Sequence, residues 1–354
     1  MGQNTATPRI VYLDLLRIVA IFSMMLLHVA SVNWYVLPVT SPEWQVLNSY
    51  DSLVRFCVPV MFMISGSQLL NLDKDLPFKK LFRNNILRII TAFAFWSLMY
   101  TLIYHLWRYR TINPEILLSM TKAFILGHYH LWFLYTLVGL YLIVPFLRKI
   151  VESKTLMQYY LVLSLVFAFS MNLVLVFLGD QPVVQGVLTK LSFFFTLGYS
   201  GYFVLGTYLH RYDLSSTLRR WIYGLGILSI LFTIFGTQYL SIQANQPIEK
   251  LYSYLLPTTF LTSAAVFLFF KSHFSNLKLS STTLQRIQRL SKLTFGMYLF
   301  HDFVNLFFRN VLNLTSISVH PILAVPLLSI MVFGLSFVAS WILNKIPLIN
   351  KYFV

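Results

Sequence analysis

The sequence predicts an all-α, polytopic integral membrane protein of about ten transmembrane helices, because apolar runs of spanning length recur along it. Hydrophobic residues make up 57% of the 354-residue chain and charged residues only 11%, whereas soluble domains carry roughly 25% charge. A chain with so little polar surface needs lipid as its solvent. Aromatic residues reach 17%, which is typical of proteins whose Trp and Tyr side chains line both membrane interfaces.

The expected helices follow from apolar runs of about 18 to 25 residues, the length that crosses the hydrocarbon. We expect spans at 11–34, 51–72, 86–107, 129–147, 156–178, 191–209, 221–240, 251–270, 293–312 and 321–343, with a short interfacial helix at 116–126. The first run is too long for a signal peptide and shows no clear cleavage site, so it is expected to remain a span. One membrane domain is expected over residues 1–354, with a core at about 10–345.

The basic residues predict the orientation of the chain. With the N-terminus inside, the segments on the cytoplasmic side hold 19 of the 27 Lys and Arg residues, and the outer loops hold 5. This distribution obeys the positive-inside rule and predicts that both termini are cytoplasmic. A net charge of +16 on a soluble protein would suggest nucleic acid. Here topology accounts for the charge, so we expect membrane lipid and no nucleic acid as a partner.

Three ionisable residues lie on one stripe of the first expected span. Asp14 and Arg17 are three residues apart and therefore neighbours on a helix. His28 follows Arg17 by three helical turns, about 16 Å along the axis with only ~20° of drift. Ionisable groups inside a span are costly and usually functional. The alternative is that Arg17 extends to the interface, Asp14 neutralises it and His28 bonds a carbonyl.

Five motifs occur in an order that points to a known family. They are Asp14-x-x-Arg17 with His28, FMISG at 62–66, the basic stretch at 79–88, HLWFL at 130–134 and TFGMYLFH at 294–301. Together they resemble the membrane acyltransferase-3 family, in the variant without a C-terminal esterase-like domain. The stretch at 79–88 departs from the family pattern because it is poorer in arginine.

The resemblance implies an acyl-CoA-dependent O-acetyltransferase. Such an enzyme moves an acyl group, most often acetyl, to a hydroxyl of a cell-surface glycan or its lipid-linked precursor. The resemblance also implies a multi-pass protein of a bacterial plasma membrane. It assigns catalysis to His28 and Arg17, with Asp14 as their acidic companion. A neutral histidine can deprotonate the acceptor hydroxyl or accept the acyl group itself, and the sequence leaves both roles open.

The donor is expected to be acetyl-CoA or another acyl-CoA, whose nucleotide is polyanionic. A basic cytoplasmic rim suits phosphate groups, and its candidates are Lys79, Lys80, Arg83 and Arg88. Topology alone also explains basic residues in this segment. Ser65 and Gly66 either line the donor tunnel or permit close helix packing.

The candidate acceptor-binding residues lie in two expected spans. His130 and Trp132 begin the fourth span at its outer end, and Tyr298 and His301 lie in the ninth. Trp132 also suits an aromatic belt, and His301 also suits a packed bundle core. No metal site is expected, because no ligand spacing such as His-Glu-x-x-His occurs.

Three further features have simpler interpretations. Asp51 and Arg55 are four residues apart and are expected to form a local ion pair. Cys57 is the single cysteine, which excludes an intramolecular disulfide, and it is expected to pack in the core. The stretch GYSGYF at 198–203 does not match the Gly-x-Ser-x-Gly turn of serine hydrolases.

The competing function is that of a polytopic transporter or flippase of lipid-linked sugars, which also needs charges inside the membrane. Transporter folds often contain two similar halves. The stripe of the first span has no counterpart in the sixth, which favours the enzyme. A sensory or structural bundle has no need for a deep Arg–His stripe. The sequence leaves open the acceptor, the choice between acetyl and succinyl, and the oligomeric state.

Overall fold

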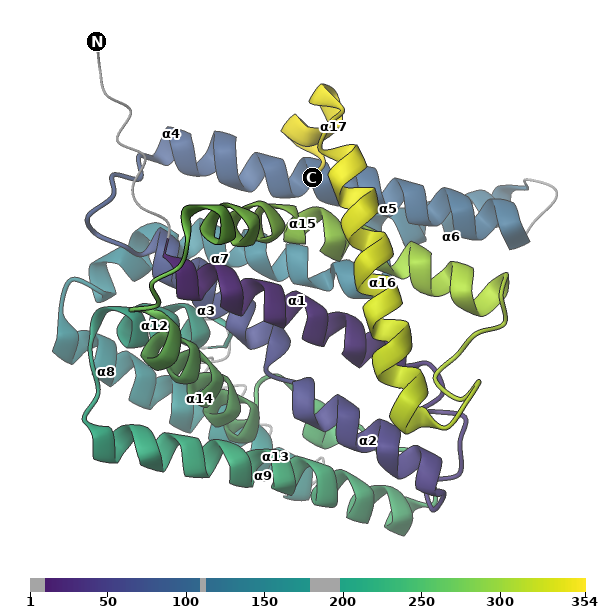
Figure 1. Cartoon of the computed structure of the whole chain (residues 1–354), viewed down its shortest axis with the longest axis horizontal. Coiled ribbons are helices and arrows are strands. Elements are labelled where there is room, and N and C mark those ends of the chain that lie inside the picture. The colour runs from purple at the N-terminus through teal and green to yellow at the C-terminus, as the bar shows by residue number, and fades with distance from the viewer. Residues whose placement is uncertain (1–9, 109–112, 179–197) are drawn as a thin grey trace.

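A computed structural model describes residues 10–108, 113–178 and 198–354, and within them every regular element is helical (Figure 1). The first half contains α1 (Val11–Ser31), α2 (Pro42–Val54), α3 (Cys57–Leu69), α4 (Phe78–Lys80), η1 (Leu81–Ile86), α5 (Leu87–Arg108), α6 (Pro114–Leu126), η2 (Tyr129–Leu131) and α7 (Trp132–Ile150). The second half contains α8 (Lys154–Leu163), η3 (Ser164–Ser170), α9 (Met171–Leu178), α12 (Ser200–Arg211), α13 (Ser216–Ala244), η4 (Lys250–Tyr252), α14 (Pro257–Phe274), α15 (Ser281–Asn310), α16 (Pro321–Leu343) and α17 (Pro347–Tyr352).

Eight helical stretches of the described chain are long and apolar enough to cross a membrane. They are Val11–Ser31, Pro42–Leu69, Phe78–His105, Pro114–Ile150, Lys154–Leu178, Ser216–Ala244, Lys250–Phe274 and Pro321–Leu343. The prediction of an all-α polytopic membrane protein is therefore confirmed.

Two of the expected spans are missing from this set for different reasons. The span at 191–209 lies partly outside the described residues, and its second half is the buried helix α12. The span at 293–312 is helical within α15. It carries His301, Asp302 and Arg309, whose polarity lowers the mean hydropathy of the helix. The polar groups of α15 therefore keep its mean hydropathy below that of a typical span, although the helix packs inside the bundle.

Several helix boundaries differ from those expected because polar caps extend the helices beyond their apolar cores. The second span begins at Pro42 rather than 51, where the Ser41 side chain accepts a hydrogen bond from the Trp44 amide. This helix breaks at Arg55, and α3 continues it from Cys57. The helix expected at 116–126 is present as α6.

Helix α1 lies in the middle of the bundle and contacts α2, α3, α14, α15 and α16 (Figure 1). In the same view α4 and α5 form one edge and α13 the opposite edge. This central position accounts for the burial of most of α1. Ionisable side chains on α1 therefore point into protein rather than lipid.

Helices α3 and α12 cross at close range through two glycines. A Cβ atom on Gly66 would lie 2.3 Å from the Phe203 carbonyl oxygen, and one on Gly206 would lie 2.1 Å from the Met63 carbonyl oxygen. No side chain fits at either point, so glycine lets the two backbones touch. The contact directs Gly66 toward α12.

Candidate active site

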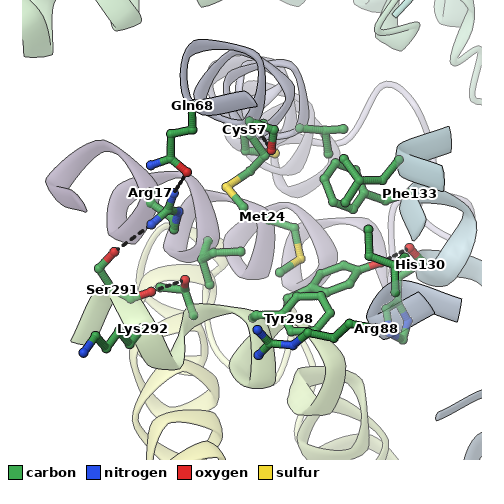
Figure 2. Close-up of a pocket in the computed structure, with 18 of the residues that line it drawn as sticks. Arg17, Met24, Cys57, Gln68, Arg88, His130, Phe133, Ser291, Lys292 and Tyr298 are labelled. Carbon is green, nitrogen blue, oxygen red and sulfur yellow. Dashed lines mark hydrogen bonds between the residues drawn. The ribbon is translucent and has the colours of Figure 1, made fainter. Parts of the chain in front are cut away.

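A cavity of about 520 Å³ lies inside the bundle, beside α1. Helices α3, α5, α7 and α15 supply most of its other walls. Figure 2 shows Arg17, Gln68, Ser291 and Lys292 gathered at one end and His130 with Phe133 at the other, with Met24 between them. His28, near the C-terminal end of α1, also lines the cavity. One cavity therefore contains both residues of the predicted Arg–His pair.

Arg17 is held in place by side chains from three helices. Its Nη1 lies 3.5 Å from Asp14 Oδ1, which confirms the expected pairing of these neighbours. Arg17 also donates to Ser291 Oγ at 3.1 Å and to Gln68 Oε1 at 3.2 Å (Figure 2). Ser291 in turn donates to Asp14 Oδ1 at 2.5 Å. The network fixes the direction of the guanidinium while its side chain stays 17% exposed.

Of the four basic residues predicted to bind the nucleotide, only Arg88 lines this cavity. Arg88 donates a hydrogen bond to the Val354 carbonyl oxygen, which brings the end of the described chain beside it. Lys79, Lys80 and Arg83 are exposed and lie outside the cavity wall. Lys292 of α15 lines the cavity, although the sequence analysis did not single it out.

At the other end, three imidazole rings from three different elements lie against one another. The His28 and His301 rings stack with centroids 5.2 Å apart and planes 28° apart. The His130 ring lies 4.9 Å from the His301 ring, edge to face. His301 Nδ1 lies 2.7 Å from the Tyr298 carbonyl oxygen. Since a carbonyl only accepts, this nitrogen carries the proton.

A second layer of polar groups supports these rings. His128 Nδ1 lies 3.1 Å from His130 Nδ1, and His128 Nε2 lies 3.5 Å from Asp302 Oδ2. Tyr129 donates to the other carboxylate oxygen of Asp302 at 2.8 Å. His128 and Tyr129 were not predicted from the sequence, because their partner Asp302 is remote in sequence. The one signal for a polar cluster in the sequence was Asp302 itself, a carboxylate within an apolar run.

His128, His130 and Asp302 each offer one atom that can bind a metal ion, and these atoms lie within 4.8 Å of one another. The close contacts use opposite nitrogens of the His128 ring, Nδ1 toward His130 and Nε2 toward Asp302. A metal ion would need only one nitrogen of His128, and one ligand atom of each residue lies within 4.8 Å of the others. The contacts at 3.1 and 3.5 Å, which use both nitrogens of His128, also form a chain of polar contacts.

Aromatic side chains form the wall near His130. Tyr298 donates from its hydroxyl to the His130 carbonyl oxygen at 2.8 Å. The Trp132 ring stacks on Tyr254 with centroids 5.7 Å apart. Trp132, Tyr254 and Tyr298 all line the cavity. His301, the fourth predicted acceptor residue, is absent from the described lining and contacts three residues that belong to it, His28, His130 and Tyr298.

Ser65, Gly66 and Cys57 occupy different positions on α3. Ser65 lines the cavity and donates to the Met61 carbonyl oxygen at 2.9 Å. Gly66 packs against α12, so the geometry favours the packing alternative for this residue. Cys57 is fully buried in the core, as expected, and also borders the cavity.

The expected ion pair of the second span is present at its break. Arg55 Nε lies 2.5 Å from Asp51 Oδ1, and the Arg55 guanidinium lies 4.1 Å from the centroid of the Tyr252 ring. The same guanidinium lies 5.7 Å from the Tyr254 ring. The pair thus supports the aromatic wall from outside the cavity.

The fold and the site together define a helical, multi-pass membrane protein whose internal cavity joins an arginine and a histidine of one helix. The comparison with protein families agrees with this class and makes it specific. Residues 10–341 match the model of the acyltransferase-3 family, described as an acyltransferase domain, and the chain belongs to that family. The match covers nearly the whole chain. No curated protein and no solved structure matches the chain.

Proposed function

We propose that the protein transfers an acyl group, most simply acetyl, from cytoplasmic acyl-CoA to a hydroxyl of a cell-surface glycan or its lipid-linked precursor. Family membership supports membrane acyl transfer itself. The observation that carries the more specific proposal is the single cavity lined by both Arg17 and His28. We further propose cytoplasmic termini, on the charge distribution of the segments between spans, and a bacterial plasma membrane, which the resemblance to the family implies.

The cationic end of the cavity suits the donor nucleotide. Arg17 and Lys292 line this end, and Arg88 of a third helix lines the cavity beside Tyr298 (Figure 2). Arginine offers a planar fork that matches phosphate oxygens, and lysine adds a compact charge. Lys79 and Lys80 precede Arg88 on exposed surface, where they can attract a polyanion before it enters the cavity.

The pantetheine arm is proposed to run beside α1 from Arg17 toward His28. Those two residues are about 16 Å apart along the helix axis. Met24 and Ile21 line the cavity along this path and suit the less polar part of the arm. The thioester then lies near the cluster of imidazole rings, where proton transfer is available.

Two reaction sequences satisfy the bonding changes. In the first, His28 takes the acceptor hydroxyl proton, the oxygen attacks the thioester carbon, and the C–S bond breaks. The CoA thiolate then takes up the proton. In the second, a His28 nitrogen attacks the thioester carbon and releases the thiolate. The acceptor oxygen then takes the acyl group from the imidazole, and the hydroxyl proton passes to the thiolate. Both sequences end with one ester and one free thiol.

The aromatic wall suits a sugar acceptor. Trp132, Tyr254 and Tyr298 present flat rings to the cavity near His130. The apolar face of a pyranose stacks on such rings, while its hydroxyls remain directed at the histidines.

The test uses purified protein in nanodiscs with labelled acetyl-CoA, and it measures CoA release and label transfer. We expect His28→Ala to lower kcat by roughly 100-fold or more, because one general base contributes about 10²–10⁴-fold. Arg17→Ala is expected mainly to raise KM for the donor. Exposed His273 and Arg220 provide the matched controls His273→Ala and Arg220→Ala, which should behave as wild type.

Other acyl-CoAs, including succinyl-CoA, are tested in the same assay. Turnover of one of these but not of acetyl-CoA would change the donor and keep the acyltransferase. A wild-type protein that neither binds nor turns over any acyl-CoA would refute the proposal and favour the transporter.

A further inference from the structure

We propose that His130 is a second base of this site and that Asp302 and His128 are positioning residues that hold its Nε2 as a proton acceptor. The inference deepens the proposed acyl transfer and rests on it for its chemistry. Its structural part concerns which ring nitrogen of His130 carries the proton, and this part can be measured without any turnover.

The chain of contacts begins at a buried carboxylate. Asp302 is 5% exposed and lies on α15 between Tyr129 and His128. Tyr129 donates to Oδ1, which leaves Oδ2 facing His128 Nε2 at 3.5 Å. A negative charge at this distance in a poorly solvated region favours the tautomer of His128 with its proton on Nε2. The other nitrogen of neutral His128, Nδ1, then carries a lone pair.

The lone pair on His128 determines the tautomer of His130. The two Nδ1 atoms are 3.1 Å apart, so one of them must donate and the other accept. Because His128 Nδ1 is the acceptor, His130 Nδ1 is the donor. The lone pair of neutral His130 therefore lies on Nε2.

His130 Nε2 is a buried atom of a residue that lines the cavity. The residue is 2% exposed and lines the cavity, and this nitrogen has no hydrogen-bond partner among the described residues. A buried acceptor without a partner costs free energy until something donates to it. In the proposed reaction, a hydroxyl of the acceptor bound in the cavity supplies that donor.

The surrounding contacts hold the ring in one place. Tyr298 bonds the His130 backbone oxygen at 2.8 Å. The Tyr100 ring lies 5.1 Å from the His130 ring and stacks on His128 at 4.3 Å. His301 also packs edge to face against the His130 ring. The orientation of His130 is thus fixed by α5 and α15 as well as by its own segment.

The proton then has a defined route. In the sequence through acyl-His28, the acceptor hydroxyl gives its proton to His130 Nε2, and its oxygen forms the new bond to the acyl carbon. The bond that breaks joins the acyl carbon to the His28 nitrogen. The resulting imidazolium is stabilised through His128 by Asp302, as the aspartate of a catalytic triad stabilises its histidine. The CoA thiolate finally takes up the proton.

The first measurement is nitrogen NMR of the full-length protein in lipid, with ¹⁵N-labelled histidine at pH 8. The chain has 8 histidines, and the His130 signals are assigned by their loss in His130→Gln. We expect a protonated Nδ1 and an unprotonated Nε2 in wild type, and the reverse in Asp302→Asn. An amide at 302 can donate to His128 Nε2, which inverts both tautomers.

Asp302→Glu retains the charge and should retain the wild-type tautomer. Asp213→Asn, on an exposed carboxylate paired with Lys271, is the matched control. Wild-type His130 with its proton on Nε2, or a tautomer that Asp302→Asn leaves unchanged, would overturn the inference.

The second measurement is acyl transfer from acetyl-CoA to octyl glucoside, a sugar with a lipid tail. Asp302→Asn is expected to lower kcat by at least 100-fold and to leave KM for acetyl-CoA within twofold of wild type. The Asp302→Glu variant should have a kcat between those of Asp302→Asn and wild type. Wild-type kcat in Asp302→Asn would refute the role in turnover. No turnover by wild type on any acyl-CoA would refute the proposed function, whereas the tautomer result would stand.

Discussion

His28 of α1 and His301 of α15 stack ring on ring, with centroids 5.2 Å apart and planes inclined by 28°. His301 is fully buried, and its Nδ1 bonds the Tyr298 carbonyl oxygen. The contact joins the first and the ninth expected spans at the depth of the proposed chemistry. It makes His301 a platform that fixes the plane of the His28 ring.

We expect His301→Ala to lower kcat for acetyl-CoA turnover by roughly 10-fold, because an aromatic pair is worth about 0.5–1.5 kcal/mol and sets the ring orientation. His301→Phe should recover most of this loss, since a flat ring restores the stacking. Steady-state kinetics of both variants provide the test. An activity of His301→Phe as low as that of His301→Ala would show that the nitrogens of His301, rather than its ring face, are needed.

Arg88 should matter more for donor binding than the basic residues before it. Arg88→Gln is expected to raise KM for acetyl-CoA about 10-fold, because a hydrogen-bonded charge in the cavity is lost. Lys79→Gln with Lys80→Gln should raise KM only at low salt, since exposed charges are screened beyond about 8 Å at physiological ionic strength. KM measured from 20 to 300 mM salt separates the two cases. A double lysine variant as defective as Arg88→Gln at high salt would contradict this assignment.

The α3–α12 crossing should be sensitive to a single methyl group. Gly66→Ala would place Cβ 2.3 Å from the Phe203 carbonyl oxygen, and overpacking of this kind costs about 1–3 kcal/mol. We expect a lower Tm in detergent than for wild type. Gly224→Ala is the control, because nothing lies within 4 Å of its added Cβ atom. A Gly66→Ala protein as stable as this control would show that the two helices separate readily.

The charge distribution predicts which loops face the cytoplasm. In a Cys57→Ala background, Asn276→Cys tests the segment between α14 and α15, and Val319→Cys tests the segment between α15 and α16. A membrane-impermeant maleimide added to intact cells should label the cysteine at position 319 and leave the one at 276 unlabelled until the cells are opened. The opposite labelling pattern would show that the chain has the reverse orientation, with the cationic end of the cavity on the outer side of the membrane.

Hydropathy and helical periodicity identified the features that depend on one helix at a time. The apolar runs predicted the membrane class, and eight candidate spans are present among the described residues. The spacing of Asp14 and Arg17 predicted a pair that the structure contains. The Asp51–Arg55 pair follows from the same rule. These predictions succeed because residues three or four apart on a helix are neighbours whatever surrounds them.

Only the tertiary structure decided which helices meet around the cavity. It selected Arg88 among four basic candidates, added Lys292 and turned Gly66 toward α12. It also brought His128 to Asp302. Contacts of this kind depend on which faces of remote helices pack together, and hydropathy carries no information about partners because every span is apolar. The sequence by itself therefore determined the membrane class, the α1 stripe and the family motifs, whereas packing determined the site.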